Sequence, residues 1–162
     1  MASADFEPFE RKMQSEGLPE VAIRTFRYYY EQLVSGDAGT LSRAAIDPID
    51  EVPSAEALVG TAEAGKAALK RAVVIKLNGG LGTSMGMTRA KSLLTVKDDL
   101  TFLDLICRQV LHMRERFGCR IPLLLMNSFR TRDDSLAVVS RYGDLGAGLG
   151  GDFLQHKVPR IR

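Results

Sequence analysis

The chain has 162 residues, of which 45% are hydrophobic and 26% are charged, and these values are ordinary for a globular protein. Its net charge of +2 is unevenly distributed: residues 1–70 carry 7 basic and 12 acidic side chains, and residues 71–162 carry 15 basic and 8 acidic ones. The second part therefore either meets an anion or has a solvated basic face. Because no apolar run approaches ~20 residues, and neither a secretory leader, a disulfide framework nor a histidine-rich metal site is indicated, we expect a cytoplasmic protein without a membrane partner.

The first part of the chain is expected to be an N-terminal helical segment. One short helix is predicted over 6–16. A second helix follows Pro19, because apolar residues recur there at helical spacing, namely Ile23, Phe26, Tyr30 and Leu33. Residues 45–54 contain two prolines and are interpreted as a connector, and 55–71 as a third helix. The tyrosines at 28–30 have the composition of a platform for stacking bases, but this spacing is more typical of a helix core and rim, so no nucleic-acid partner is expected.

Strands and helices alternate in the second part of the chain. Strands are predicted over 72–77, 121–127 and 152–158, and helices over 100–118 and 131–143. The expected buried face of the first of these helices consists of Phe102, Leu105, Ile106, Val110, Met113 and Phe117, with Cys107 also in the core. This order predicts βαβ units, hence an α/β fold with a mostly parallel, Rossmann-like sheet. We therefore divide the chain into a helical segment, 1–70, and an α/β part, 71–162.

A glycine-rich loop, 78–91, follows the first strand and ends in a lone lysine, Lys91. Glycine lets a ligand approach the backbone closely, and successive N–H groups can converge on an anion. The end of a parallel strand is also where open α/β sheets bind ligands. We therefore predict that Lys91 binds phosphate, together with a phosphate loop made by Gly82, Thr83, Ser84 and Gly86. The alternative is a loop that only turns the chain and a lysine that is only solvated.

Two known phosphate-binding patterns do not fit this loop. A Walker A motif needs glycine before Lys-Ser, but Ala90 stands there. A dinucleotide fingerprint that starts at Gly80 needs glycine at position 85, which is occupied by Met85. The stretch GAGLGG at 146–151 does fit G-x-G-x-x-G. However, it follows a predicted helix and precedes a predicted strand, which is the reverse of the required context, so it is interpreted as a flexible connection.

The motif KLNGGLGTSMG, followed by AKSLL, resembles the signature of the eukaryotic-type UTP–glucose-1-phosphate uridylyltransferases, or UDP-glucose pyrophosphorylases. The resemblance runs from about 73 to 161 and implies an α/β nucleotidyltransferase fold. By position it implies that Lys91 binds the UTP phosphates as a catalytic residue. It also implies that Gln155 recognises uracil, whose imide edge suits an amide that offers both donor and acceptor. Four further residues would contact the nucleotide: Leu77, Asn78, Gly79 and Gly80.

The reaction implied by this resemblance is uridylyl transfer from UTP to glucose 1-phosphate, which gives UDP-glucose and pyrophosphate, with Mg²⁺ neutralising the triphosphate. Lys91 and the loop amides would stabilise charge on the departing pyrophosphate. Family members are much longer than this chain, and their metal-binding aspartate and second phosphate-binding lysine are expected beyond the stretch that ends at Arg162. No metal ligand is therefore assigned here, although Asp144 and Asp152 flank the second glycine stretch and are conceivable ligands.

Two departures from the family pattern stand out: Arg89-Ala90 replaces Gly-Pro before the lysine, and Arg130 replaces Asn after Ser-Phe. The loss of proline is expected to loosen the approach to Lys91, and Arg89 is expected to add charge near the phosphates.

Two other functions stay open. One is a non-catalytic module that binds uridine nucleotides, and the other is a pyrophosphorylase for another UDP-sugar such as UDP-N-acetylglucosamine. A partial sheet would also expose an edge and an apolar face, so association into oligomers is expected to be possible.

Overall fold

The computed structural model describes residues 5–37 and 39–161, whose contacts group into two compact units. The helical unit comprises the described residues up to Pro53 together with those from His156 onward, and the sheet unit comprises Ser54–Gln155. These units differ from the division at residues 70 and 71 proposed above, because the third helix groups with the sheet and the last residues group with the first two helices. The proposed functional division stays a prediction.

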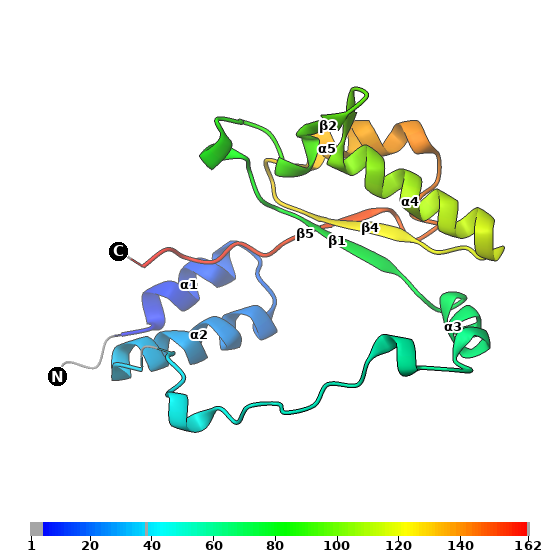
Figure 1. The fold of residues 1–162 in the computed structure, drawn as a ribbon. Helices are drawn as coiled ribbons and strands as arrows, with labels where there is room; N and C mark the ends of the chain where they lie inside the picture. Colours follow the sequence, from blue (N-terminus) through cyan, green and yellow to red (C-terminus); the bar gives the residue numbers. More distant parts are fainter. Residues whose placement is uncertain (1–4, 38, 162) are drawn as a thin grey trace. The chain divides into compact units, whose positions relative to one another are not determined.

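The helical unit contains α1 (Glu7–Ser15) and α2 (Glu20–Ser35), as predicted (Figure 1). Both helices are followed by glycines in the left-handed region, Gly17 with φ 69° and Gly36 with φ 84°. The helices pack through a cluster of aromatic rings, Phe6, Phe9, Phe26 and Tyr30, with ring centroids 5.1–6.2 Å apart. Leu33, the last residue of the apolar series in α2, is 58% exposed, because it lies a turn beyond the contact that Tyr30 makes with Phe6 at the start of α1.

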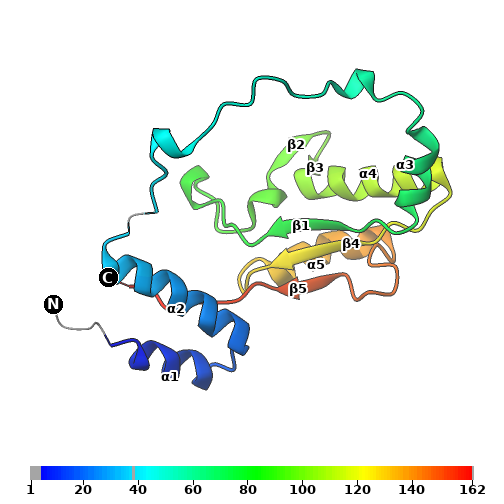
Figure 2. The ribbon, with the colours of Figure 1, turned by 90° about the horizontal axis from the view of Figure 1, so that it is seen from below.

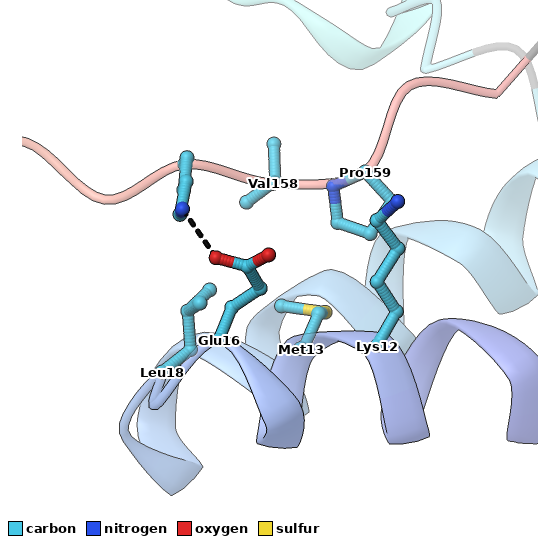
Figure 3. Close-up of a pocket in the computed structure, with 7 residues that line it drawn as sticks. Lys12, Met13, Glu16, Leu18, Val158 and Pro159 are labelled. Atoms are coloured by element: carbon cyan, nitrogen blue, oxygen red, sulfur yellow. Dashed lines mark hydrogen bonds and ion pairs between the residues drawn. The ribbon is translucent and has the colours of Figure 1, made fainter. Parts of the chain in front are cut away.

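The last described residues of the chain pack on α1 within the helical unit. Val158 and Pro159 line a small pocket with Met13 and Leu18, and Lys157 Nζ forms an ion pair with Glu16 (Figure 3). The third strand is therefore shorter than the predicted 152–158, since the chain leaves the sheet after Leu154 and joins the helical unit.

The connector after α2 is exposed and irregular, with short 3-10 turns at Arg43–Ala45 and Ala55–Ala57. The third helix, predicted over 55–71, is only α3 (Ala62–Leu69). The first half of the prediction is wrong because Gly60 has a φ of 76°, which no helix accommodates.

The sheet unit is built on three parallel strands in the order β1-β4-β5. They are β1 (Val74–Asn78), β4 (Leu123–Asn127) and β5 (Asp152–Leu154), and they confirm the predicted parallel α/β fold. A small hairpin of β2 (Thr95–Lys97) and β3 (Leu100–Thr101), which was not predicted, precedes α4 (Phe102–Phe117). Both α4 and α5 (Arg132–Val139) lie on one face of the sheet (Figures 1 and 2).

The core lies between these helices and the sheet, and it is formed by Leu103, Cys107, Val110, Leu123, Leu125 and Leu145. Cys107 is therefore in the core as predicted, and burial raises the pKa of its thiol to about 11. The predicted face of α4 is partly wrong, because Phe102 and Phe117 are 47% and 39% exposed. The helix starts in a capping box between Thr101 and Asp104, and this start turns Leu103 and Cys107 toward the sheet instead.

The opposite face of the sheet is apolar and open. Ile75 and Leu77 of β1 are 51% and 66% exposed, and Phe153 of β5 is also exposed. The first strand, interpreted from its apolar sequence as buried, is covered only on the side that α4 and α5 occupy (Figure 1). The expectation that the sheet exposes an apolar face is thus confirmed. Within residues 5–37 and 39–161, no helix combines the length and apolarity needed to cross a bilayer.

The carboxylate of Asp104 is buried at the start of α4 and accepts four hydrogen bonds. They come from the Thr101 N–H (2.8 Å) and hydroxyl (2.6 Å), the Arg141 guanidinium (3.0 Å) and the Tyr142 hydroxyl (2.7 Å). Burial by itself raises the pKa of this carboxyl, but the bonds from Thr101 and Tyr142 and the charge of Arg141 outweigh it and leave the pKa below its ordinary value. The ionised form therefore stabilises the fold above the unfolded pKa, and this stability is lost as the pH falls through the folded pKa.

We expect Asp104→Asn to lower the free energy of unfolding by about 1–3 kcal/mol at pH 7, because the amide cannot accept all four bonds. Urea unfolding at pH 7 and at pH 3 measures this, and the difference from the unchanged chain should shrink at pH 3. Glu115→Gln, on the exposed side of α4, is the matched control. An equal loss of stability at both pH values would contradict the ionic origin of the effect.

The glycines at 146–151 turn the chain from the end of α5 into β5, which confirms that this stretch does not join a strand to a helix. A Cβ on Gly146 would lie 2.7 Å from the backbone nitrogen of Gly151 and 2.8 Å from its Cα. We expect Gly146→Ala to cost about 1–3 kcal/mol of stability, as overpacking against backbone does. Thermal unfolding measures it, with Gly65→Ala in α3 as control: its Cβ meets nothing within 4 Å, so that variant should be no less stable. Equal melting temperatures for the two variants would refute the steric explanation.

Candidate functional site

The glycine loop after β1 folds back on itself as an irregular hairpin. The Lys91 N–H donates to the Gly80 carbonyl and the Gly82 N–H donates to the Arg89 carbonyl, each over 3.0 Å. Leu81 and Ala90 face each other between these bonds as an isolated antiparallel bridge. Ala90 is fully buried in an extended conformation with φ −56°, which proline also adopts. The backbone at Lys91 is therefore held in place without the family's proline.

Two of the predicted phosphate-loop glycines are required by the fold of the loop itself. A Cβ on Gly82 would lie 2.7 Å from both Cβ and Sδ of Met87, and Gly86 has a φ of 69°. Between them Thr83 and Ser84 lie exposed in a 3-10 turn, with hydroxyls at the surface. Their contact with phosphate stays a prediction.

The other two glycines, Gly79 and Gly80, adjoin the side chains predicted to hold the two ends of a nucleotide. A Cβ on Gly79 would lie 2.1 Å from Oε1 of Gln155, and a Cβ on Gly80 would lie 4.0 Å from Cδ of Lys91. Gln155 is held there because its N–H donates to the Asn127 carbonyl over 2.8 Å, which continues the pairing of β5 with β4. The structure thus brings four residues predicted from distant stretches of sequence to one place at the carboxyl end of the sheet.

Leu77 and Asn78 point in opposite directions from β1. The Leu77 side chain is on the open face of the sheet, whereas the Asn78 amide is buried. Asn78 Nδ2 donates to Asn127 Oδ1 (2.8 Å) and to Ser135 Oγ (2.7 Å), and its Oδ1 accepts from the Ser92 hydroxyl. Because this side chain is saturated within the protein, its predicted contact with a nucleotide falls to the backbone. Asn127, Ser92 and Ser135 were not predicted, since a polar residue in the sequence gives no sign of its partners in the fold.

The two conceivable metal ligands are engaged with arginines. Asp152 receives two bonds from Arg132, with Nε at 2.7 Å, and one from Asn127, and the bond from Arg132 holds the pKa of the Asp152 carboxyl below its ordinary value. Asp144 lies 3.4 Å from the Arg120 guanidinium. In the described part of the chain, no three His, Cys, Asp or Glu side chains are grouped to hold a metal ion. These residues therefore do not fit a metal centre.

Arg89, expected to add charge near the phosphates, lies 3.6 Å from Asp134 in the first turn of α5. Both side chains are largely exposed, so this ion pair contributes little to stability. It nonetheless offsets part of the positive charge that the substitution of glycine by arginine brings to the loop.

A family model described as UTP–glucose-1-phosphate uridylyltransferase matches residues 23–162. The chain belongs to this family. It is 49% identical over 96 residues to the UTP–glucose-1-phosphate uridylyltransferase of Solanum tuberosum, an alignment that covers 59% of this chain and 20% of that protein. It is 42% identical over 137 residues to the enzyme of the same name from Hordeum vulgare, which covers 79% of this chain and 28% of the relative.

Solved structures of the uridylyltransferase family agree with the fold as well. A mutant UDP-glucose pyrophosphorylase from Leishmania major, in complex with UDP-glucose, superposes with a TM-score of 0.86 at 34% identity over 99% of this chain and 34% of that one. A protein from Trypanosoma brucei titled UDP-glucose phosphorylase gives 0.76 at 34% identity, over 95% and 33% of the two chains. The resemblance read from the glycine motif is thus confirmed, and the chain spans between 20% and 34% of the lengths of these relatives.

Proposed function

We propose that this chain supplies the UTP-binding part of a UTP–glucose-1-phosphate uridylyltransferase, which forms UDP-glucose and releases pyrophosphate. One observation carries the proposal: the adjacent glycines Gly79 and Gly80 adjoin the side chains of Gln155 and Lys91, respectively. A nucleotide needs a donor–acceptor pair for its base and a cation for its phosphates, and a backbone without Cβ atoms allows it to lie close between them.

In the proposed mechanism Gln155 pairs with the imide edge of uracil, and Lys91 contacts phosphate oxygens. A phosphate oxygen of glucose 1-phosphate attacks the α-phosphorus of UTP, the bond to the β-phosphate breaks, and pyrophosphate leaves. Lys91 stabilises the charge that grows on this leaving group. No general base takes part, because a phosphate monoester is already ionised at neutral pH. The chemistry therefore depends on positioning and charge, which suits a site without a histidine or cysteine nucleophile.

Mg²⁺ is proposed as the metal of this reaction, but the residues described here assemble no set of ligands for it, so no step is assigned to it. A cytoplasmic location is also proposed, consistent with the free thiols of Cys107 and Cys119. Glucose 1-phosphate is favoured over other sugar phosphates because a structural relative is in complex with UDP-glucose.

The test is an assay of a full-length protein that carries this segment. With UTP and glucose 1-phosphate it should release pyrophosphate and form UDP-glucose, and with N-acetylglucosamine 1-phosphate it should be much slower. The reverse order of rates would favour the other UDP-sugar. UTP binding without any sugar-nucleotide product would instead leave the non-catalytic module as the better description.

A further inference from the structure

Two buried asparagines end the neighbouring strands beside the candidate site. Asn78 ends β1 and Asn127 ends β4, and the two are direct partners in the parallel ladder. The two residues are 4% and 0% exposed, and Asn78 Nδ2 donates to Asn127 Oδ1 over 2.8 Å. Buried amides are costly unless they are fully hydrogen-bonded, whereas a satisfied network fixes one arrangement of its parts. What this pair fixes follows from its other partners.

The network leads from the pair to both sides of the candidate site. On one side, Asn78 Oδ1 accepts from the hydroxyl of Ser92, the residue next to Lys91. On the other side, Asn127 Nδ2 donates to the carboxylate of Asp152 over 3.2 Å, and Asp152 begins β5, the strand that Gln155 directly follows. The buried hydrogen bonds thus connect the segment that carries Lys91 with the segment that carries Gln155.

Asn127 is the residue on which the two sides converge. Its side chain holds β1 and β5, and its carbonyl accepts the Gln155 N–H over 2.8 Å. It is fully buried, so it has no surface for a ligand. The distance between a base held at Gln155 and a phosphate held at Lys91 therefore depends on how Asn127 joins the strands.

We propose that Asn127 is a positioning residue, which sets the spacing of Lys91 and Gln155 for one nucleotide without touching it. This rests on the proposed function, since it assigns phosphate and base to those two side chains. Loss of the Asn127 side-chain bonds shifts the two ends of the site relative to each other. UTP binding and the choice of base are then weakened together, while the groups that meet the nucleotide are unchanged.

The test is Asn127→Asp in the full-length enzyme. This nearly isosteric change replaces a donor with an acceptor that faces the Asp152 carboxylate. The KM for UTP should rise about tenfold, the equivalent of one lost net hydrogen bond, and the UTP/ATP preference should fall.

The matched control is Ser135→Ala, which is equally buried and removes another bond to Asn78 but leaves the bonds of Asn127 in place. It should lower thermal stability and leave the KM and base preference unchanged. If Asn127→Asp does not fold, Asn127→Ser takes its place, since its short side chain loses the bonds to Asn78 and Asp152 without adding a charge.

If the wild-type enzyme had no uridylyltransferase activity, the proposed function itself would be refuted, whatever the Asn127 variants do. With active wild type, a folded Asn127 variant whose KM and UTP/ATP preference match those of Ser135→Ala would overturn the proposal.

Discussion

Replacement of Lys91 by alanine is expected to lower the turnover of the full-length enzyme by about 10²-fold or more, the scale for one lost preorganised electrostatic contact. The side chain is exposed, and the Lys91 N–H bond to the Gly80 carbonyl does not involve it. Lys91→Ala therefore removes the charge at little cost to the fold. Because the charge acts most on the departing pyrophosphate, kcat should fall more than the KM for UTP rises.

Steady-state kinetics with UTP and glucose 1-phosphate measure this effect. Lys91→Arg keeps the charge with a different shape and should recover part of the activity. Lys97→Ala, an exposed lysine on the β2–β3 hairpin, is the control for loss of positive charge near the sheet and should leave turnover unchanged. Turnover of Lys91→Ala equal to that of Lys97→Ala would remove Lys91 from the catalytic machinery.

The sequence predicted those parts of the fold that local rules determine. Alternating apolar segments and glycines placed the two N-terminal helices, α4, and the parallel order of β1 and β4, because periodicity and chain stops act within a few residues. The rotation of α4 was missed because Thr101 and Asp104 fix its start through a hydrogen-bonded cap, and a pattern of apolar residues does not contain that information. An open apolar face was expected, but which face of β1 would stay open was not, because an apolar strand does not reveal which of its faces is covered.

For the candidate site too, local sequence features predicted some residues and could not predict others. Lys91 and the glycines were found because the loop composition is unusual, and Gln155 was found only through the family resemblance. Composition could not show that Gly82 and Gly86 are needed for the conformation of the loop itself. In a sequence, a glycine needed for a close contact within the fold looks the same as one needed for a ligand. The Asn78–Asn127 pair joins residues far apart in the chain, and its partners follow only from the register of the two strands.

The second large effect is expected at Gln155. Gln155→Ala should lower the preference for UTP over ATP by at least ~10-fold, because the loss of a paired amide costs about one net hydrogen bond or more for uracil and nothing for adenine. Competition between UTP and ATP in the full-length enzyme measures the ratio of kcat/KM values. Gln155→Glu is the informative companion: it keeps the shape but loses one donor, so it should discriminate poorly as well.

Gly79 offers an independent route to the same result. A Cβ at this position would lie 2.1 Å from Gln155 Oε1, so Gly79→Ala must displace the Gln155 amide while leaving it in the chain. Since the displaced atom is at the end of a flexible side chain, the fold should be affected little, but the preference for UTP should fall as it does in Gln155→Ala. If Gly79→Ala and Gln155→Ala both kept the wild-type UTP/ATP ratio, the base would have to be recognised elsewhere. A fall in both would place uracil at the Gln155 amide, because both substitutions take that amide out of its present position.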